Sequence, residues 1–352
     1  MTSLDAATRL AAARRCPAQL CVIAGGEVVL DTAFGCQPDS LFFLFSASKP
    51  MVALLVHLLA ERGELSLDDP VARYWPTFGQ RGKQDITVRQ VLQHRSGLPV
   101  ARNMARDALA MTDWAASVRA LERAAPSYPP GQVPAYHVIS YGFLLGELVQ
   151  RVTGVPVRDF LSTELLSPLG LRDTFLGLPA ERWPRHVPVS GRGPAELATQ
   201  LVINRRSTRQ AVIPAASVSA TANNLARLYQ ALLNGGELDA VRVLKPETIA
   251  AARQPSSDGE MDRYLHLPVR WSQGFQLGGG RTGSARAGGR HHPMGDLASP
   301  AAFGHNGSYV CIGWADPDRQ IAVGYLTARL VSRAEGALHM AAVSDAILAA
   351  CN

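Results

Sequence analysis

Strand-like patterns are confined to the two ends of this chain, and that distribution restricts the fold more than any other feature. Near the amino terminus, the segments QLCVIAGG (19–26) and EVVLDTAFG (27–35) flank Gly25-Gly26, which predicts a β-hairpin. Residues 308–330 predict a second hairpin that turns at Asp316-Pro317-Asp318, followed by a helix from about 333 to 350. Because strands at both ends of a chain often join one sheet, we expect the termini to lie together.

Between these hairpins the apolar residues recur at helical spacing. Residues 48–62 form a strongly apolar helix, in which Pro50 is tolerated in the first turn and which Gly63 ends. Helical spacing also occurs in 87–94, 110–124, 140–153 and 222–234.

The stretch from 76 to 205 is rich in proline and arginine and poor in strand signals, which predicts a helical insertion. We therefore predict one unit, 1–352, of the α+β (mixed α/β) class. An antiparallel sheet flanked by helices is expected from residues 1–75 and 206–352, and an all-helical inserted part from 76–205.

Charge and cysteine usage exclude several classes of partner. The formal net charge is +6, but the basic residues are scattered, which argues against a nucleic-acid partner. No stretch is apolar for long enough to span a membrane, and the beginning of the chain does not resemble a signal peptide. The five cysteines form no CxxC pair and no metal spacing with histidine, so we expect a reduced, cytoplasmic setting and no metal site. The sequence does not indicate an oligomeric state.

A glycine-rich, basic segment at 278–290 could suggest a phosphate loop. It lacks the GxxxxGK[ST] order, and no apolar strand clearly leads into it. We expect a mobile surface loop there.

The segment Leu44-Phe45-Ser46-Ala47-Ser48-Lys49-Pro50 carries the chemistry. A serine three residues before a lysine, on the first turn of a helix, shares a face with it. Free N–H groups at the helix start can hold an oxyanion, and burial makes the lysine less basic. Lys49 could then accept the proton of Ser46, which predicts a Ser–Lys nucleophile pair.

The scarcity of lysine adds weight to that pair. The chain has lysine only at positions 49, 83 and 245, and uses arginine elsewhere. Arginine cannot act as a base because it stays protonated, so a rare lysine at this spacing is informative. The alternative interpretation is that Ser46 caps the helix and Lys49 is a solvated first-turn residue.

The order of later blocks resembles the serine β-lactamase-like and penicillin-binding-protein-like family, in its class C β-lactamase and esterase branch. The resemblance covers about residues 18 to 350, with the SxxK motif at Ser46–Lys49. It continues through GELSLDDPVARYWPTF (63–78), ITVRQVLQHRSGLP (86–99), PGQVPAYHVISYGFLLGELVQRVTG (130–154), SATANNLARLYQALLNGG (219–236) and FGHNG (303–307). It implies a β-lactamase/transpeptidase-like fold with the site between the sheet and the helical part.

The resemblance assigns roles to residues of the second and third motifs. Tyr136 would relay a proton to the leaving group, with its pKa lowered by Lys49. His305 would polarise the site, Gly307 would let the substrate lie close, and a strand is expected to follow. The oxyanion hole would be the backbone N–H groups of Ser46 and Ser308. As alternatives, Tyr136 is a packed aromatic and the GHNG segment a turn.

One position departs from the family pattern. The tyrosine motif often reads Tyr-x-Asn, whereas here Val138 replaces the asparagine and cannot form a side-chain hydrogen bond. We therefore expect poor hydrolysis of penicillins and cephalosporins. His137 and Asn306 are candidates for substrate binding, although a structural role for His137 has comparable weight.

These observations predict a serine hydrolase that forms an acyl-enzyme on a small-molecule acyl substrate and needs no cofactor. A carboxylesterase acting on small esters is the first hypothesis. An acyl or amide transferase of secondary metabolism would use the same residues. A β-lactamase or D-amino-acid peptidase and an inactive ligand-binding relative are further alternatives.

Overall fold

The computed structural model describes residues 4–279 and 292–351 of the chain. The glycine-rich segment 278–290 therefore lies almost entirely outside the described residues. No helix in the described part is long and apolar enough to cross a membrane.

A six-stranded antiparallel sheet combines the two ends of the chain. Its strand order is β10 (Gln276–Leu277), β11 (Phe303–Gly307), β12 (Cys311–Asp316), β13 (Ile321–Thr327), β1 (Ala18–Ala24) and β2 (Glu27–Phe34). Both predicted hairpins, β1–β2 and β12–β13, are confirmed. They join where Ala18 of β1 pairs with Thr327 of β13.

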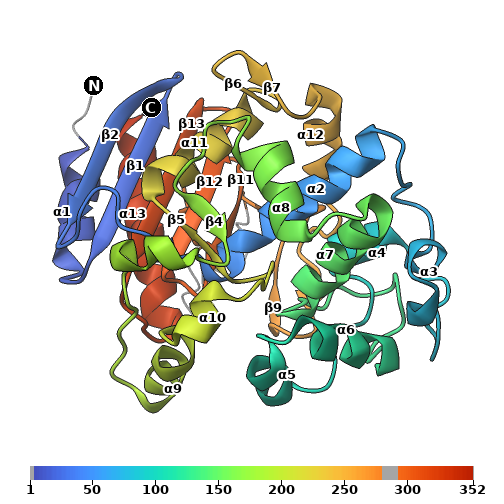
Figure 1. Ribbon diagram of the computed structural model, residues 1–352. Coiled ribbons are helices and arrows are strands. Elements are labelled where there is room, and N and C mark those ends of the chain that lie inside the picture. The colour runs from blue at the N-terminus through green and yellow to red at the C-terminus, as the bar shows by residue number, and fades with distance from the viewer. Residues whose placement is uncertain (1–3, 280–291, 352) are drawn as a thin grey trace.

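Helices cover both faces of this sheet (Figure 1). The described helices are α1 (Asp5–Ala13), α2 (Lys49–Glu61), α3 (Val71–Tyr74), α4 (Val88–Leu92), α5 (Met104–Ala110), α6 (Trp114–Arg123), α7 (Ser140–Thr153), α8 (Val157–Leu161), α9 (Pro194–Ile203), α10 (Arg206–Gln210), α11 (Ala222–Leu233), α12 (Pro246–Ala252) and α13 (Arg333–Ala350). Helices α1 and α13 pack on each other, which brings the two ends of the described chain together.

Alternation along the strands separates the two cores. Leu20 and Val22 of β1 face the core under α1 and α13, whereas Cys21 and Ile23 face the larger core on the opposite side. On that opposite side, Gly313 of β12 and Gly324 of β13 pair with each other. A Cβ atom at either position would collide with α11, so these glycines let the helix lie directly on the sheet.

Helix α2 is apolar on all sides because it is buried on all sides. Its residues from position 49 to 59 are all buried, and it packs against α7, α8, α12 and β11. Figure 1 shows α2 lying between the sheet and the helical part of the molecule. The start of α2 is therefore placed where these two parts meet.

Within residues 76–205 the described elements are mainly helical. Predicted helix 110–124 forms only from Trp114, because the side chain of Asp113 accepts a hydrogen bond from the Ala116 N–H (2.9 Å) and begins α6 there. One short strand, β4 (Thr174–Leu176), pairs with β5 (Val218–Ala220), which also pairs with β3 (Phe42–Phe43). The remaining strands form two small hairpins, β6 (Glu237–Leu238) with β7 (Val241–Arg242), and β8 (Met261–Asp262) with β9 (Leu267–Pro268). The division of the chain at residues 75 and 205 stays a prediction.

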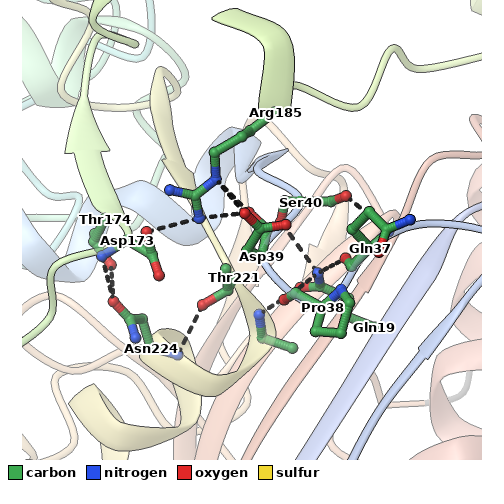
Figure 2. Close-up of polar contacts among 11 residues, drawn as sticks. Gln19, Gln37, Pro38, Asp39, Ser40, Asp173, Thr174, Arg185, Thr221 and Asn224 are labelled. Carbon is green, nitrogen blue, oxygen red and sulfur yellow. Dashed lines mark hydrogen bonds and ion pairs between the residues drawn. The ribbon is translucent and has the colours of Figure 1, made fainter. Parts of the chain in front are cut away.

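A buried glutamine fixes the segment that leads from β2 to β3. The Nε2 group of Gln19 donates to the carbonyls of Gln37, Pro38 and Ser40 at 3.0–3.1 Å (Figure 2). Its Oε1 atom accepts a hydrogen bond from the N–H of Ala222, at the start of α11 (2.9 Å). The irregular backbone before β3 is thereby tied to the central sheet.

An arginine extends this network toward β4. Figure 2 shows Arg185 between Asp39 and Asp173, with ion-pair distances of 3.1 and 2.7 Å. The Oδ1 atom of Asn224 accepts a hydrogen bond from the N–H of Asp173 (2.8 Å). Because the N–H of Leu41 also donates to the carbonyl of Arg185 (2.7 Å), these contacts help to position β3.

Candidate active site

The predicted nucleophile lies on a 3₁₀ turn, η1 (Phe45–Ser48), that continues directly into α2. A 3₁₀ turn has three residues per turn, so side chains at positions i and i+3 lie one above the other. The Nζ atom of Lys49 accordingly lies 3.1 Å from the Oγ atom of Ser46. The sequence expectation that these two side chains share a face is met by this geometry.

Strand β5 fixes the turn from one side. The N–H of Leu44 donates to the carbonyl of Val218 (2.8 Å), and the Oγ atom of Ser48 accepts from the N–H of Val218 (3.2 Å). Between these anchors, Phe45 has a φ of 47°, which is unfavourable for a residue with a side chain. The surrounding contacts therefore hold the residue before Ser46 in a strained conformation.

Strand β11 fixes the turn from the other side. The Sγ atom of Cys311 lies 2.8 Å from the carbonyl oxygen of Leu44. A Cβ atom at Gly307 would lie 2.0 Å from that same oxygen, so only glycine permits this approach. The third motif thus packs directly beside the segment that precedes Ser46.

Lys49 is buried, and the described residues offer it no acidic partner. It is 1% exposed, and its other polar contact is the carbonyl of Ala215 at 3.4 Å. The ion pairs found among the described residues do not include it. Burial lowers the pKa of Lys49 well below its usual value. A buried amine whose charged form is disfavoured, next to a hydroxyl that is itself partly exposed, can accept the hydroxyl proton.

Tyr136 lies over this pair. The Nζ atom of Lys49 is 4.7 Å from the centroid of the Tyr136 ring, and the phenol interacts with the side chain of Ser46 through a hydrogen bond. Burial raises the pKa of Tyr136, although the hydrogen bond with Ser46 opposes the shift. The expectation that Lys49 lowers this pKa is wrong, because desolvation of the phenol dominates. Tyr136 is therefore a protonated phenol at ordinary pH.

His305 faces the same region from β11. Its Nδ1 atom donates to the carbonyl of Asn306 (2.7 Å), so its Nε2 atom is an acceptor. Within the described residues, Nε2 has no hydrogen-bond partner, although the side chain is buried. Burial, with a smaller contribution from Lys49, lowers the pKa of His305 to about 3. The imidazole is therefore neutral at ordinary pH.

The structure differs from the sequence expectation in the position of the strand. The GHNG segment is part of β11 itself, and the chain reverses directly after it. Ser308 and Tyr309 have φ values of 49° and 54°, and the N–H of Val310 donates to the carbonyl of Gly307 (2.9 Å). Two successive positive φ angles form a tight hairpin turn, which the residue types at this turn do not indicate.

The two candidate binding residues have protein partners. The Nδ2 group of Asn306 donates to Gln276 (2.9 Å). His137 is fully buried, with its ring nitrogens facing Ser96 (2.5 Å) and His94 (3.2 Å). Burial lowers the pKa of His137 to about 3. The structure therefore places His137 in a buried polar cluster beneath Tyr136.

Sequence reasoning missed two residues that touch Tyr136. The indole of Trp271 stacks on its ring, with centroids 5.3 Å apart and an interplanar angle of 10°. The buried carboxylate of Asp262 accepts a hydrogen bond from the backbone N–H of Tyr136 (3.1 Å). Both residues come from a segment more than 120 positions later that carries no recognisable motif. Among the described residues, no group of histidine, cysteine and acidic side chains could hold a metal ion.

Comparison with known proteins finds one protein family, and several relatives and solved structures, that resemble this chain. The sequence profile of the family described as Beta-lactamase matches residues 6–346. The chain is 32% identical to the Esterase/beta-lactamase LipL of Mycobacterium tuberculosis, over 84% of this chain and 70% of that protein.

Two solved structures also match almost end to end. One is a family VIII carboxylesterase, with 26% identity, a TM-score of 0.85, and coverage of 99% of this chain and 97% of the other. The second is a penicillin-binding protein homolog from Caulobacter crescentus, with 29% identity, a TM-score of 0.82 and the same coverage. Both share the antiparallel sheet with flanking helices.

Proposed function

The chain belongs to the beta-lactamase family of serine hydrolases, and on this premise we propose that it hydrolyses small carboxylic esters through an acyl-enzyme on Ser46. The observation that carries the proposal is the contact between Ser46 and the buried Lys49, which has no acidic partner among residues 4–279 and 292–351. Similarity to a carboxylesterase and to an esterase/beta-lactamase supports esters as the substrate class.

The proposed acylation step uses three side chains. Lys49 takes the proton from the Oγ atom of Ser46 while this oxygen forms a bond to the acyl carbon. The bond from that carbon to the alkoxy oxygen then breaks, and Tyr136 gives its proton to the leaving alkoxide. Protonated Lys49 returns a proton to Tyr136, so acylation ends with both side chains in their starting states.

Deacylation repeats the sequence with water as the nucleophile. Lys49 accepts a proton from the water, which attacks the acyl carbon, and Ser46 leaves with a proton restored by Tyr136. In both steps the backbone N–H groups of Ser46 and Ser308 would bind the oxyanion. The acceptor Nε2 of His305 would orient a hydroxyl group of the substrate or the attacking water.

Val138 supports the preference for esters over β-lactams. Its N–H donates to the carbonyl of Pro99 (3.0 Å), and its side chain packs on the apolar core. It therefore offers no hydrogen bond to a substrate amide.

The test is a comparison of p-nitrophenyl acetate and butyrate with a chromogenic cephalosporin. We expect rapid ester hydrolysis that falls by about 10⁴-fold or more in Ser46→Ala, because the nucleophile is lost. Ser66→Ala, a change at an exposed serine, is the matched control and should keep full activity. Full ester hydrolysis by Ser46→Ala would overturn the proposal, and cephalosporin turnover at the rate of the esters would overturn the substrate class.

Product analysis separates hydrolysis from acyl transfer. With an added primary amine, a hydrolase still releases mainly the free acid. Amide as the main product would replace the hydrolase assignment by an acyltransferase that uses the same residues.

A further inference from the structure

The segment that carries Tyr136 has neither helix nor strand, so its backbone N–H groups must find partners elsewhere. Four consecutive groups do so across the fold. The N–H groups of Ala135 and Val138 donate to the backbone carbonyls of His94 (2.9 Å) and Pro99 (3.0 Å), respectively. The N–H of Tyr136 donates to Oδ1 of Asp262 (3.1 Å). The N–H of His137 donates to Nδ1 of His94 (3.1 Å). Backbone carbonyls accept two of these hydrogen bonds, and the side chains of Asp262 and His94 accept the other two.

Asp262 is fully buried at the end of β8 and is held by donors rather than by a cation. Besides the N–H of Tyr136, its Oδ1 atom accepts hydrogen bonds from the N–H groups of Tyr264 (2.9 Å) and Leu265 (2.8 Å). Its Oδ2 atom accepts from Nε1 of Trp271 (3.0 Å). No ion pair to Asp262 occurs in the part of the chain that the structure describes. Four N–H donors thus satisfy the hydrogen-bonding capacity of this buried carboxyl group.

The same carboxylate fixes Tyr136 from two directions. One oxygen holds the backbone of Tyr136, while the other orients the indole of Trp271, which stacks on the phenol ring. The ring thus contacts both the Trp271 indole and the Lys49 amine. Asp262 itself makes no contact with Ser46 or Lys49 among those found in the described residues.

We propose that Asp262 is a positioning residue for the reaction, which acts by holding Tyr136 and Trp271 so that the phenol stays within reach of Ser46. This inference rests on the proposed function, because it matters only if Tyr136 transfers a proton. The negative charge of Asp262 has a second consequence. It adds to the effect of burial in raising the pKa of Tyr136, which keeps the phenol protonated and leaves Lys49 as the base.

The test is Asp262→Asn, in which one carboxylate oxygen becomes an amide that cannot accept a hydrogen bond. We expect kcat for p-nitrophenyl butyrate to fall by about 10–100-fold with KM nearly unchanged, because a small displacement of a proton donor affects the transition state more than substrate binding. The matched control is Asp258→Asn, because Asp258 is exposed and forms its ion pair with Arg270 on the same segment. A rise in KM with unchanged kcat would overturn the proposal.

A double-mutant cycle separates positioning from general structural damage. If Asp262 acts through Tyr136, then Asp262→Asn should change kcat by less than about twofold when Tyr136 is already phenylalanine. An equal loss in both backgrounds would overturn the proposal, and so would full activity of Tyr136→Phe. Neither result would touch the acyl-enzyme on Ser46, whose failure would appear only in Ser46→Ala.

Hydrogen exchange on the unmodified protein gives a test that does not depend on the folding of a variant. We expect the backbone amides of residues 135–138 to exchange as slowly as those of helix α7, because each has a buried acceptor. Exchange of the Tyr136 amide as fast as in an exposed loop would overturn the proposal.

Discussion

The two halves of the proposed site are held in different ways. Ser46 and Lys49 lie on a 3₁₀ turn and a helix, whose backbone hydrogen bonds are mostly local. Tyr136 lies on an irregular segment, whose backbone is held by His94, Pro99 and Asp262 from distant parts of the chain. The proposed base, Lys49, thus lies on a regular helix, whereas the proposed acid, Tyr136, is held in place by tertiary contacts. Changes in the first half should abolish chemistry, and changes in the second should misplace a group that is still present.

The largest expected effect is on the helical half. Lys49→Arg keeps a cation but removes the base, because arginine does not lose its proton at ordinary pH. We expect kcat/KM for ester hydrolysis to fall by about 10⁴-fold. The matched control is Lys245→Arg, at an exposed lysine, which should leave activity unchanged. Activity of Lys49→Arg within tenfold of the wild type would remove the distinction between the two halves.

A smaller loss is expected on the irregular half. Tyr136→Phe removes the phenol proton but keeps the stacked ring, so kcat should fall by about 10²–10³-fold while the serine can still be acylated slowly. Tyr325→Phe, a buried tyrosine that contacts His339 on the far face of the sheet, serves as the control. Loss of all reaction at Ser46 in Tyr136→Phe would mean that the phenol, rather than Lys49, is the base.

The packing between β11 and the nucleophile turn can be tested with a single methyl group. Gly307→Ala places a Cβ atom on the carbonyl of Leu44, which must move away, so we expect kcat to fall by about tenfold or more. Gly313→Ala, which collides with Tyr229 of α11 instead, should lower stability without changing kcat of the folded enzyme. Equal kcat values for the two variants would show that the position of β11 does not control the turn.

The smallest effect concerns stability and has the opposite sign. Because the pKa of Lys49 is lowered on folding, the folded protein binds fewer protons than the unfolded chain, and burial of this lysine costs free energy at any pH below about 10.5. Lys49→Met should therefore raise the free energy of unfolding by about 2 kcal/mol at neutral pH, although the variant is inactive. The gain should shrink as the pH approaches 10.5. Urea denaturation at pH 6 and pH 10 measures it, and a gain that grows with pH would contradict the lowered pKa.

Local patterns account for what could be predicted from the sequence. The end hairpins, helix α2 and the Ser46–Lys49 spacing depend on residues close together in the chain, and the structure reproduces each of them. The tight turn at Ser308-Tyr309 could not be predicted, because its positive φ angles occur at residues that do not favour them. The raised pKa of Tyr136 depends on burial, which no short motif reports.

The support for Tyr136 is the part that the sequence could not indicate. Asp262 and Trp271 contact it only because the β8–β9 hairpin folds onto the segment from 134 to 136, where the N–H of Arg263 donates to the carbonyl of Pro134 (2.9 Å). A contact between residues more than 120 positions apart leaves no periodic pattern in the sequence. His94 likewise supplies two of the four backbone contacts of that segment, from more than 40 residues earlier in the chain.

The most direct test of the central claim is to trap the covalent intermediate. The enzyme is mixed with a fluorophosphonate or a slowly released p-nitrophenyl ester, quenched, and analysed by intact mass and by peptide mapping. We expect one adduct, located on Ser46, absent in Ser46→Ala and formed far more slowly in Lys49→Met. An adduct on another residue, or no adduct on an enzyme that hydrolyses the ester, would contradict the proposed acyl-enzyme on Ser46.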